Sequence, residues 1–572
     1  MINIKSFVAN EIKKSVVNEF PGCEISADEI NKMLECPPNR DLGDFALPCF
    51  KLSKTLRCSP VIIAVNLARK IECTLIKSAN AVNGYLNLKI ADSYYSEEVI
   101  DGIISDGDDY GKNSDGLGKT MVIDYSSPNV AKPFHIGHLG STVIGHSIKK
   151  LHKFSGWKAI GINHLGDWGT QFGKMITAYR MWGDPENIRR EGIDGLVELY
   201  VRFHREAEHN PVLNDTAREE FAKLERGDPE NMKLWREFLA ISIEEYKKTY
   251  EQLGIEFDYY TGESFYSNLM TPQVEILREK GLLKIDDGAS IVDLSDYNMP
   301  PCLILKKDGS TLYPTRDIAA AVYRKETFDF DKAVYVTSNQ QILHFRQLFK
   351  VIELMGYDWY NELVHIPYGT VSINGEKLAT RSGNVVLLKN LFTEATEKVF
   401  EIIKSKNPDL ENKEDVATSV GVGAIVFYYL LNSRIKDSDF KLEDALNFDG
   451  NTGPYVQYTY ARCCSVIEKA GGIPDSLSAR GYLPCEAEIS LAKTLSLFGE
   501  KVREALAAYE PMIITRYLLD VAGEFNKFYH DCRIISEKDE RTRSFRIRLT
   551  EAARITIGNS LELICMKKTA KI

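Results

Sequence analysis

The sequence predicts an α/β protein in which a Rossmann-like, parallel-sheet body lies between an α+β N-terminal module and an all-α C-terminal helical bundle. A chain of 572 residues is long enough for several domains, each with its own core. A short apolar run at 120–125 (TMVIDY) leads through a glycine-containing loop into a helix that begins near His138. That order opens a mononucleotide-binding fold. After Val386 the hydrophobic spacing becomes almost wholly helical.

The N-terminal module is assigned to residues 1–115. Residues 1–20 have the spacing of an amphipathic helix with lysines, and they lack the apolar centre of a secretory signal. The segment 105–119 (SDGDDYGKNSDGLGK) is rich in Gly, Asp and Ser and poor in apolar residues. We therefore expect a linker there, between the module and the body.

The central body is assigned to residues 116–386. The segment 156–169 (GWKAIGINHLGDWG) predicts a second strand with a polar exit, and 332–341 and 363–371 predict further strands. A charge-laced helical segment at about 175–255 interrupts this pattern, and we interpret it as an insertion. Alternation of strands with helices is typical of a parallel sheet.

The C-terminal part is predicted to contain a helical connecting region, 387–445, and an α-helical domain, 446–572. Its clearest helix spans 511–532, with Pro511 at the start, where a missing N–H costs nothing. The helical spacing puts a set of apolar side chains on one face of this helix: Ile514, Leu518, Val521, Phe525, Phe528 and Cys532.

Composition excludes several classes of protein. The net charge of −10 argues against a generally basic nucleic-acid coat, but the last 40 residues carry ten Lys or Arg against five Asp or Glu. The eleven cysteines include no C-x-x-C pair, so we expect reduced thiols, no zinc and a cytoplasmic location. The longest apolar run, 420–431 (VGVGAIVFYYLL), is too short to cross a bilayer, which predicts no membrane association.

The residues HIGH at 135–138 are the strongest candidate for chemistry. Gly137 allows close approach of a ligand to the backbone, and the helix that follows directs free N–H groups at the loop. His135 and His138 can donate hydrogen bonds to phosphate oxygens as charge builds up on ATP. The alternative is that the two histidines only cap or pack the helix.

Four segments in this order resemble arginyl-tRNA synthetases, a family of class I aminoacyl-tRNA synthetases. They are SSPNVAKPFHIGHLGST (126–142), NHLGDWGTQFG (163–173), LYPTRDIAAAVYR (312–324) and FDGNTGPYVQY (448–458). The resemblance implies that arginine and ATP form arginyl-adenylate and pyrophosphate. The arginyl group is then transferred to the 3′-terminal ribose of tRNA(Arg) for protein synthesis.

The resemblance also implies an arginine-binding set, which maps onto Asp124, Asn129, Tyr313, Asp317 and Gln341. A guanidinium is best held by carboxylates, and Tyr313 and Asp317 are one helical turn apart. Other interpretations remain open: Asp317 could be an ordinary acid at a helix start, Tyr313 could belong to the core, and Gln340 could face inward instead of Gln341.

The second signature of class I enzymes is a lysine-rich loop, and its equivalent here is EKLATRSGN at 376–384. Lys377 corresponds to the first lysine, whereas Thr380 stands where the second would be, with Arg381 beside it. We hypothesise that Lys132, just ahead of His135, supplies the missing charge. Gly140 also departs from the family pattern, because many relatives carry Arg there.

For tRNA, the resemblance implies an anticodon-binding C-terminal domain and an N-terminal module that touches the tRNA elbow. Arg541, Arg543 and Arg546 lie in the basic tail and are candidate phosphate contacts, although the bundle could instead be structural or mediate dimerisation. The expected partners are L-arginine, ATP and tRNA(Arg), with Mg²⁺ implied by the ATP chemistry, and a monomer is implied.

Two other functions stay open. A nucleotidyltransferase of the same superfamily shares the H-x-G-H turn, but the long helical C-terminus disfavours it. A non-catalytic tRNA-binding paralogue is disfavoured by the presence of His135, His138, Asn129 and Asp317. ATP–pyrophosphate exchange with arginine, with and without tRNA, separates all three.

Overall fold

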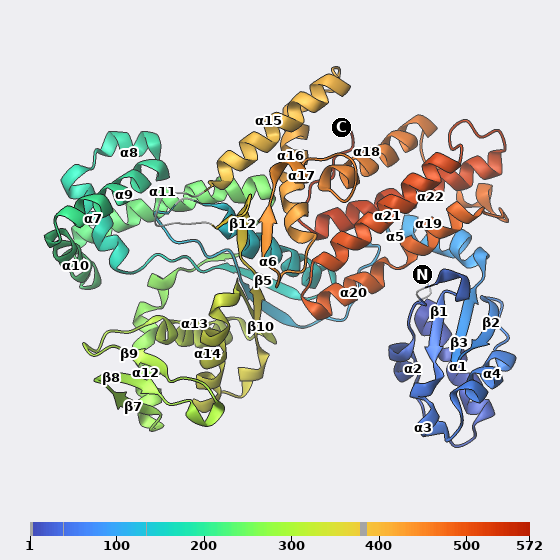
Figure 1. The fold of residues 1–572 in the computed structure, drawn as a ribbon, viewed down its shortest axis with the longest axis horizontal. Helices are drawn as coiled ribbons and strands as arrows, with labels where there is room; N and C mark the ends of the chain where they lie inside the picture. Colours follow the sequence, from blue (N-terminus) through green and yellow to red (C-terminus); the bar gives the residue numbers. More distant parts are fainter. Residues whose placement is uncertain (1–3, 38, 133, 378–385) are drawn as a thin grey trace. The chain divides into compact units, whose positions relative to one another are not determined.

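The computed structural model describes residues 4–37, 39–132, 134–377 and 386–572 (Figure 1). The chain divides into two compact units. One unit combines 1–110 with 462–498 and 520–557, and the other combines 111–461 with 499–519 and 558–572. The C-terminal helices are thus shared between the units rather than forming a third one.

The N-terminal module is an α+β structure, as predicted. Its sheet has the order β1-β3-β2 and is antiparallel, with β1 at Phe45–Pro48, β2 at Ile76–Val82 and β3 at Tyr85–Ile90. Asn83 and Gly84 join β2 to β3, and both have positive φ, at 49° and 82°. Asn-Gly is the preferred pair for such a two-residue turn, so this hairpin is encoded locally. The main helices here are α1 (Ile4–Glu19), α2 (Ala27–Met33) and α4 (Pro60–Lys70).

The larger unit is built on a five-stranded sheet with the order β11-β10-β4-β5-β6, and every neighbouring pair is parallel. Its strands are β4 (Thr120–Asp124), β5 (Lys158–Asn163), β6 (Tyr259–Tyr260), β10 (Lys332–Ser338) and β11 (Leu363–Tyr368). The predicted parallel sheet is confirmed. The first predicted strand, β4, lies at its centre and is almost entirely buried, which explains its continuous apolar run.

Helices and a small second sheet cover the strands. Helix α6 (Ile136–Phe154) packs on β5 and β10, while α13 (Tyr313–Phe328) packs on β4. The core joins Val122, Ile318 and Phe345, and it extends to an antiparallel sheet of β7 (Leu283–Asp286), β8 (Ala289–Val292) and β9 (Cys302–Leu305). Helices α12 (Met270–Glu279) and α14 (Ile342–Leu354) contribute to the same core.

Between β5 and β6 the chain forms a set of helices over the region where the sequence predicted an insertion. They are α7 (Thr170–Trp182), α8 (Pro185–Glu191), α9 (Ile193–His209), α10 (Val212–Glu225) and α11 (Pro229–Leu253). The longest, α11, begins at an Asp228 cap and ends at Gly254 in the left-handed conformation. It brings the chain back to the sheet edge at β6.

Beyond Val386 the described chain is helical apart from the short β14 (Ser438–Phe440). The principal helices are α15 (Leu388–Lys406), α16 (Lys413–Leu430), α18 (Gly453–Ala470), α19 (Glu486–Ser496), α20 (Phe498–Ala508), α21 (Met512–Asp531) and α22 (Glu540–Leu563). The apolar face predicted for 511–532 is buried in α21, with Phe525 and Phe528 fully enclosed. Within the described residues, no helix combines the length and apolar character needed to cross a membrane.

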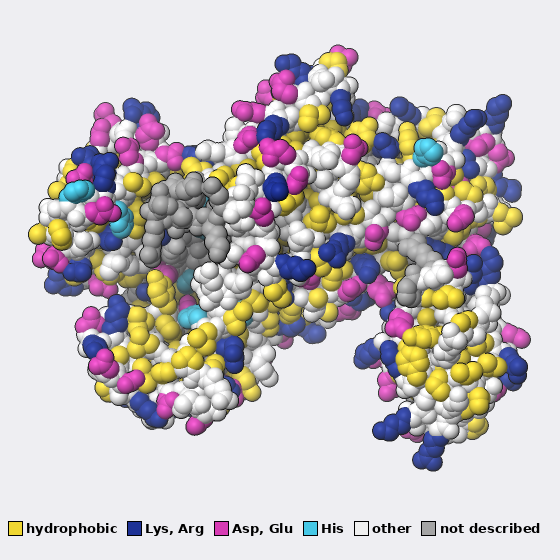
Figure 2. All heavy atoms as spheres, viewed as in Figure 1, with side chains coloured by type: hydrophobic (Ala, Val, Ile, Leu, Met, Phe, Trp, Pro, Cys, Tyr) yellow, Lys and Arg dark blue, Asp and Glu magenta, His cyan; other side chains and the backbone are white. Residues whose placement is uncertain are grey.

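Acidic and basic side chains are interspersed over the visible face of the molecule, with no large field of one sign (Figure 2). This agrees with the modest net charge of −10 in a chain of 572 residues. Any electrostatic attraction to nucleic acid must therefore come from local groups of cations and not from the surface as a whole.

Candidate active site

The loop between β4 and α6 is held in an unusual backbone conformation. Ser126, Ser127 and Ala131 have φ values of 70°, 49° and 60°, a region that residues with side chains seldom occupy. Such strain persists only where the surroundings enforce it, and it gathers at functional sites. The strained backbone therefore indicates that this loop belongs to a functional site.

Helix α11 supplies much of that enforcement through hydroxyl groups spaced four residues apart. The Ser242 hydroxyl accepts a hydrogen bond from the Ala131 N–H at 3.1 Å. The Tyr246 hydroxyl donates to the carbonyls of Asn129 and Lys132 at 2.7 and 2.8 Å. One turn further on, α11 contributes a third hydroxyl, that of Tyr250, which lies 2.8 Å from the Ser126 hydroxyl. Helix α11 thus supports the loop that precedes α6.

The two histidines of HIGH meet at the first turn of α6. The His135 Nδ1 accepts the Gly137 N–H at 3.1 Å, and the His138 Nδ1 accepts the His135 N–H at 3.2 Å. Their rings are 3.8 Å apart, centroid to centroid. Because a backbone N–H occupies each Nδ1, the proton of each neutral ring sits on Nε2. Both rings can then donate from Nε2 to a phosphate oxygen.

Electrostatics favour the neutral form of both rings. Burial, and secondarily the charge of Lys132, lowers the pKa of His135 to about 4. Burial also takes the pKa of His138 well below its usual 6.5, with His135 and Lys132 as further causes. The sequence left open whether these imidazoles are neutral or cationic, and the structure favours neutral donors near pH 7.

Gly140 has a packing reason for departing from the family pattern. A Cβ at this position would lie 2.2 Å from the hydroxyl oxygen of Tyr429 on α16, and 2.8 Å from its Cζ. Tyr429 therefore occupies the space that a larger residue at position 140 would need. The departure is explained by a partner almost 300 residues away in the chain.

The chain just after the second signature pairs with the first motif through the backbone. Residues 135 and 387 form an antiparallel bridge, in which the Ile136 N–H donates to the Val386 carbonyl at 3.3 Å. On the preceding side, Lys377 belongs to β13 (Glu376–Lys377), which pairs with β12 (Val371–Ile373). Thr380 and Arg381 lie outside the described residues.

Asn129 faces the glycine-rich segment 163–173. It forms a parallel bridge with Gly166, and a Cβ on Gly166 would lie 2.2 Å from the Asn129 Oδ1. Glycine is needed at 166 to admit this amide. The next residue, Asp167, is buried and accepts hydrogen bonds from the Ser264 N–H and hydroxyl at 2.8 and 2.6 Å.

Asp124, at the end of β4, already has a guanidinium partner inside the protein. Its Oδ2 lies 2.7 Å from Nη2 of Arg324, whose side chain is only 1% exposed. The remaining oxygen accepts the Ser127 hydroxyl at 2.9 Å. Sequence reasoning missed Arg324, although its place two helical turns after Asp317 on α13 puts both on one face.

Asp317 is partly accessible and is paired with a histidine that sequence reasoning also missed. Its Oδ2 lies 2.7 Å from His344 Nε2, and its side chain is 26% exposed. Burial lowers the pKa of His164, with the Arg324 charge acting in the same direction, while the carboxylates of Asp124, Asp317 and Asp167 each act to raise it. Carboxylates therefore gather near the carboxyl ends of β4 and β5, and two of them already have basic partners, Asp124 with Arg324 and Asp317 with His344.

Tyr313 and Gln341 lie at the exposed side of this region. Tyr313, the first residue of α13, is 63% exposed, and the Arg316 guanidinium lies 5.7 Å from its ring centroid. Gln341 immediately precedes α14 and is exposed, as is Gln340. Tyr313 is therefore not a core residue, while the choice between the two glutamines stays a prediction.

A largely enclosed ion pair lies beside Asp317. Arg316 Nη1 is 3.1 Å from Glu263 Oε2, and both side chains are about one-tenth exposed. Burial raises the pKa of Glu263 to about 7, with the Arg316 charge acting in the opposite direction. Glu263 was not among the predicted site residues, because no motif marks it.

Family models match nearly the whole chain. The model described as tRNA synthetases class I (R), catalytic domain, matches residues 99–442. The DALR anticodon binding domain matches 456–572, and the arginyl tRNA synthetase N terminal domain matches 3–90. The chain belongs to the arginyl-tRNA synthetase family.

Curated relatives and solved structures agree with this membership. The chain is 49% identical to the arginine–tRNA ligase of Alkaliphilus metalliredigens over 98% of its own length and 99% of the relative's. It is 47% identical to that of Clostridioides difficile over 99% of both. The arginyl-tRNA synthetase structures of Thermus thermophilus and Plasmodium falciparum superpose with TM-scores of 0.83 and 0.81 at 23% and 25% identity. They cover 99% and 100% of this chain, and all of their own. The predicted class I fold is thereby confirmed.

The basic tail of this family member is used largely for internal ion pairs. Arg546 lies 2.6 Å from Glu488, which is fully buried, and 3.0 Å from Glu537. Arg543 donates to the Glu537 carbonyl at 3.0 Å. Arg541 is exposed at the start of α22. Of the three predicted tRNA contacts, Arg541 is the one with a solvent-facing side chain.

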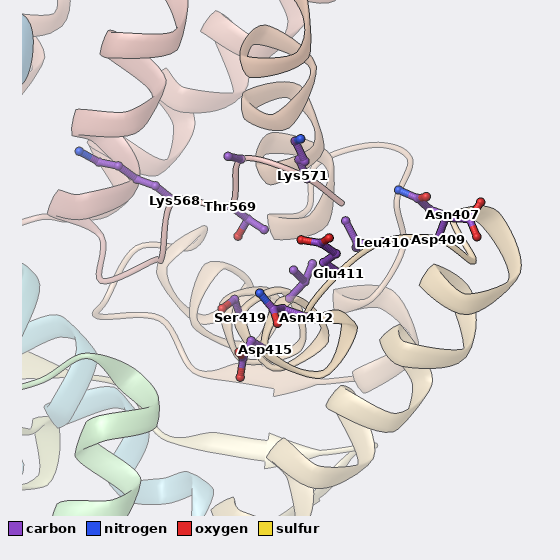
Figure 3. A pocket seen from close by; sticks show the side chains of 12 residues that line it. Asn407, Asp409, Leu410, Glu411, Asn412, Asp415, Ser419, Lys568, Thr569 and Lys571 are labelled. Carbon is purple, nitrogen blue, oxygen red and sulfur yellow. The ribbon is translucent and has the colours of Figure 1, made fainter. Parts of the chain in front are cut away.

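A hollow of about 710 Å³ lies away from these residues, between the α15–α16 connection and the C-terminal segment (Figure 3). Acidic Asp409, Glu411 and Asp415 meet basic Lys568 and Lys571 there. None of the predicted site residues lines it. Its opposite charges largely compensate, so it offers no clear preference for an anion or a cation.

Proposed function

We propose that the chain is an arginine–tRNA ligase that activates L-arginine with ATP to arginyl-adenylate and pyrophosphate. It then transfers the arginyl group to the 3′-terminal ribose of tRNA(Arg). The observation that carries this proposal is the pair of neutral imidazoles at the first turn of α6, each with Nδ1 tied to a backbone N–H. Membership of the arginyl-tRNA synthetase family supplies the substrate class.

The imidazoles act on the phosphate half of the reaction. Their Nε2–H groups and the N-terminus of α6 are positioned in advance, so they need no reorganisation as negative charge develops. A neutral donor also binds the ATP phosphates less tightly in the ground state than a cation would. More of its interaction energy is then available to stabilise the transition state. His135 and His138 are therefore assigned to transition-state stabilisation.

The arginine half is assigned to the carboxylates near β4 and α13. Asp317 is the carboxylate proposed to bind the substrate guanidinium, because its side chain is partly accessible and its present partner is the His344 imidazole. Asn129, Tyr313 and Gln341 are proposed to line the same pocket. Asp124 is paired with Arg324. We assign it a positioning role through that arginine.

Lys132 is proposed to compensate for Thr380, where the class signature has a lysine. The charge of Lys132 contributes to the lowered pKa values of His135 and His138, so it acts at the same place as the two imidazoles. Its backbone carbonyl is held by the Tyr246 hydroxyl at 2.8 Å. The main chain of Lys132 is therefore held in place, while its long alkyl stem allows the ammonium to stay close to the pyrophosphate as it leaves.

The compensation is tested by Lys132→Ala and by Lys132→Ala combined with Thr380→Lys. The single change should lower kcat for adenylate formation by about 10²–10³, with little effect on the KM for arginine. The double variant should recover part of the rate. Lys153→Ala, at the last turn of α6, is the matched control and should stay near wild type. Normal turnover in Lys132→Ala would transfer the role to Arg381.

ATP is the nucleotide substrate, and Mg²⁺ is proposed to arrive with it. Over the described ranges, the one group of three metal-capable side chains is Cys485, Glu488 and Cys532, which is not part of this site. Asp124 is occupied by Arg324. Mg²⁺ is usually bound through substrate phosphates with few protein ligands, and the residues here fit that mode.

The decisive experiment is ATP–pyrophosphate exchange with arginine, in the presence and absence of tRNA, followed by charging of tRNA(Arg). We expect exchange that depends on arginine and charging of tRNA(Arg). A nucleotidyltransferase would consume ATP without charging tRNA, and a non-catalytic paralogue would bind tRNA without exchange. Either result would overturn the assignment.

A further inference from the structure

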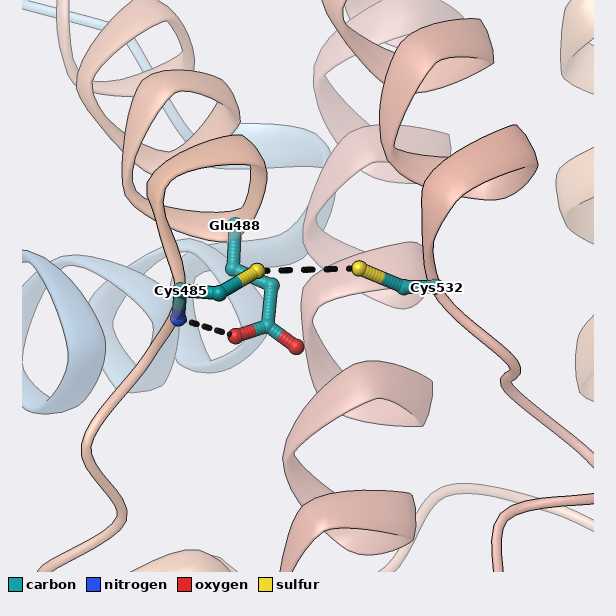
Figure 4. Close-up of side chains that lie close together, drawn as sticks. All are labelled: Cys485, Glu488 and Cys532. Atoms are coloured by element: carbon teal, nitrogen blue, oxygen red, sulfur yellow. Dashed lines mark hydrogen bonds between the residues drawn. The ribbon is translucent and has the colours of Figure 1, made fainter.

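Two cysteines meet in the helical C-terminal part. Cys485 caps the start of α19, and Cys532 directly follows α21. Their sulfur atoms are 3.7 Å apart and point toward each other from separate segments, with Glu488 beside them (Figure 4). The two sulfurs are thus in van der Waals contact, and a disulfide would bring them to about 2.05 Å.

The pair combines one accessible and one enclosed thiol. Cys485 is exposed, whereas Cys532 is only 6% exposed. Among the eleven cysteines, Cys36 is the other exposed one. An oxidant from solvent can therefore reach Cys485 first. Once Cys485 is oxidised, the sulfur in contact with it is that of Cys532.

The surroundings of the two sulfurs give each thiol a different role: Cys485 is oxidised first, and Cys532 then reacts with it. Cys485 is the N-cap residue of α19, and the N-terminus of a helix is a placement typical of reactive cysteines. Burial, with the Cys485 contact as a further cause, raises the pKa of Cys532 to about 12, so Cys532 stays a thiol until its partner is oxidised. The Arg546 guanidinium lies 2.6 Å from Glu488 and keeps that carboxylate from leaving a net charge beside the sulfurs.

We infer that Cys485 and Cys532 form a reversible disulfide when the protein meets a hydroperoxide. The Cys485 sulfur attacks the peroxide oxygen; for hydrogen peroxide, this forms a sulfenic acid and releases water. The Cys532 sulfur then attacks the sulfenic sulfur, and its proton leaves with the hydroxyl as a second water. Two thiols and one peroxide thus give one disulfide and two waters, and a dithiol reverses the bond.

A metal site is the rival interpretation, since Cys485, Glu488 and Cys532 have ligand atoms within 4.8 Å of one another. Glu488 is, however, already engaged at both oxygens. One accepts from Arg546 Nε at 2.6 Å and the other from the Cys485 N–H at 2.7 Å. The Tyr482 hydroxyl lies 3.1 and 3.3 Å from the two oxygens. A metal would have to displace these partners, whereas a disulfide leaves them in place.

The test uses the full chain, purified with a reductant and then exposed to graded hydrogen peroxide. Remaining thiols are blocked with N-ethylmaleimide, and peptides are mapped by mass spectrometry. We expect a cross-linked peptide that joins Cys485 to Cys532, lighter by about 2 Da than the two reduced peptides. Dithiothreitol should restore both thiols.

Cys485→Ser is the informative variant, because serine is a good helix N-cap and should preserve folding. In Cys485→Ser and in Cys532→Ser the cross-link should vanish, while Cys36→Ser, the control at the other exposed cysteine, should cross-link like wild type. Sulfinic acid at Cys485 with an intact Cys532 thiol would overturn the inference. So would one zinc ion per chain that both serine variants lose, because the cluster would then be a metal site.

Discussion

Single residues set the chemistry of the proposed site through their backbone contacts. His135 and His138 keep Nε2 free to donate because main-chain N–H groups occupy both Nδ1 atoms. Neither the tautomer nor the neutral state can be read from the letters HIGH. Burial decides the charge and the first turn of α6 decides the tautomer, so both properties belong to the folded chain.

Asp317→Asn tests the guanidinium partner. The substrate's charge would lose an ionised partner in a desolvated pocket, so kcat/KM for arginine should fall by about 10²-fold or more, or ~3 kcal/mol. The KM for ATP should change little. Asp329→Asn, at the C-terminal end of the same helix, is the matched control. Arginine kinetics near wild type in Asp317→Asn would remove Asp317 from the pocket.

Glu263→Gln tests the buried carboxyl beside Asp317. The pKa of Glu263 is raised to about 7 by burial, so the folded state binds this proton more tightly than the unfolded state does. The wild type therefore loses stability as the pH rises from about 4.5 to about 7, on the order of 3 kcal/mol from this group.

The check is urea unfolding of wild type and Glu263→Gln at several pH values. The stability difference between them should shift in favour of the variant as the pH rises through that window. The matched control is Glu275→Gln, which removes a carboxyl at an exposed position on α12. A constant difference for Glu263→Gln would mean that the carboxyl titrates normally.

At the scale of elements, two helices from other parts of the chain hold the motif in place. Helix α11 fixes the strained loop with Ser242, Tyr246 and Tyr250, and α16 presents Tyr429 to Gly140. The four-residue spacing of the three hydroxyls puts them on one face of α11. That periodic stripe is a signal by which their role could have been found in the sequence.

Gly140→Ala tests the contact between α6 and α16. The new Cβ would lie 2.2 Å from the Tyr429 hydroxyl, so we expect a loss of about 1–3 kcal/mol in the free energy of unfolding. Tyr429→Phe should recover part of it by removing the oxygen. Gly523→Ala on α21 is the matched control: a Cβ there meets nothing within 4 Å, and helix propensity favours alanine by about 1 kcal/mol. Equal stability for Gly140→Ala and wild type would show that the helices separate easily.

For the whole molecule, the C-terminal helices do two kinds of structural work. Residues 520–557 pack with the N-terminal module, whereas 558–572 pack in the unit of the parallel sheet. The Ser147 hydroxyl on α6 donates to the Leu563 carbonyl at 2.7 Å, and the Cys565 sulfur lies 3.9 Å from the Val143 carbonyl oxygen. The last residues of the chain therefore support the helix that carries HIGH.

Arg541 and Arg546 separate a role in tRNA binding from a role in stability. Arg541→Gln should leave unfolding unchanged, weaken tRNA binding and flatten its dependence on salt by roughly one phosphate contact. Arg546→Gln should lower stability by about 3 kcal/mol, because the buried Glu488 would lose its charge partner. Filter binding over a salt series and thermal melts measure the two effects. An unchanged salt slope in Arg541→Gln would mean that this arginine does not meet tRNA.

The sequence by itself determined what depends on local pattern. Strand–loop–helix order predicted the parallel sheet around β4, the Asn83–Gly84 turn is specified by its two residues, and the apolar spacing of 511–532 predicted the buried face of α21. Four motifs in order indicated the family, which the comparisons confirm. Each of these features is carried by residues within a few turns or strands of one another.

Only the tertiary structure decided which distant side chains are partners. Asp124 pairs with Arg324 across 200 residues, Gly140 with Tyr429, Glu263 with Arg316, and Cys485 with Cys532. No local periodicity encodes such pairs, because they result from how helices and strands pack. Packing also sets burial, and burial determines the pKa values of His135 and Glu263.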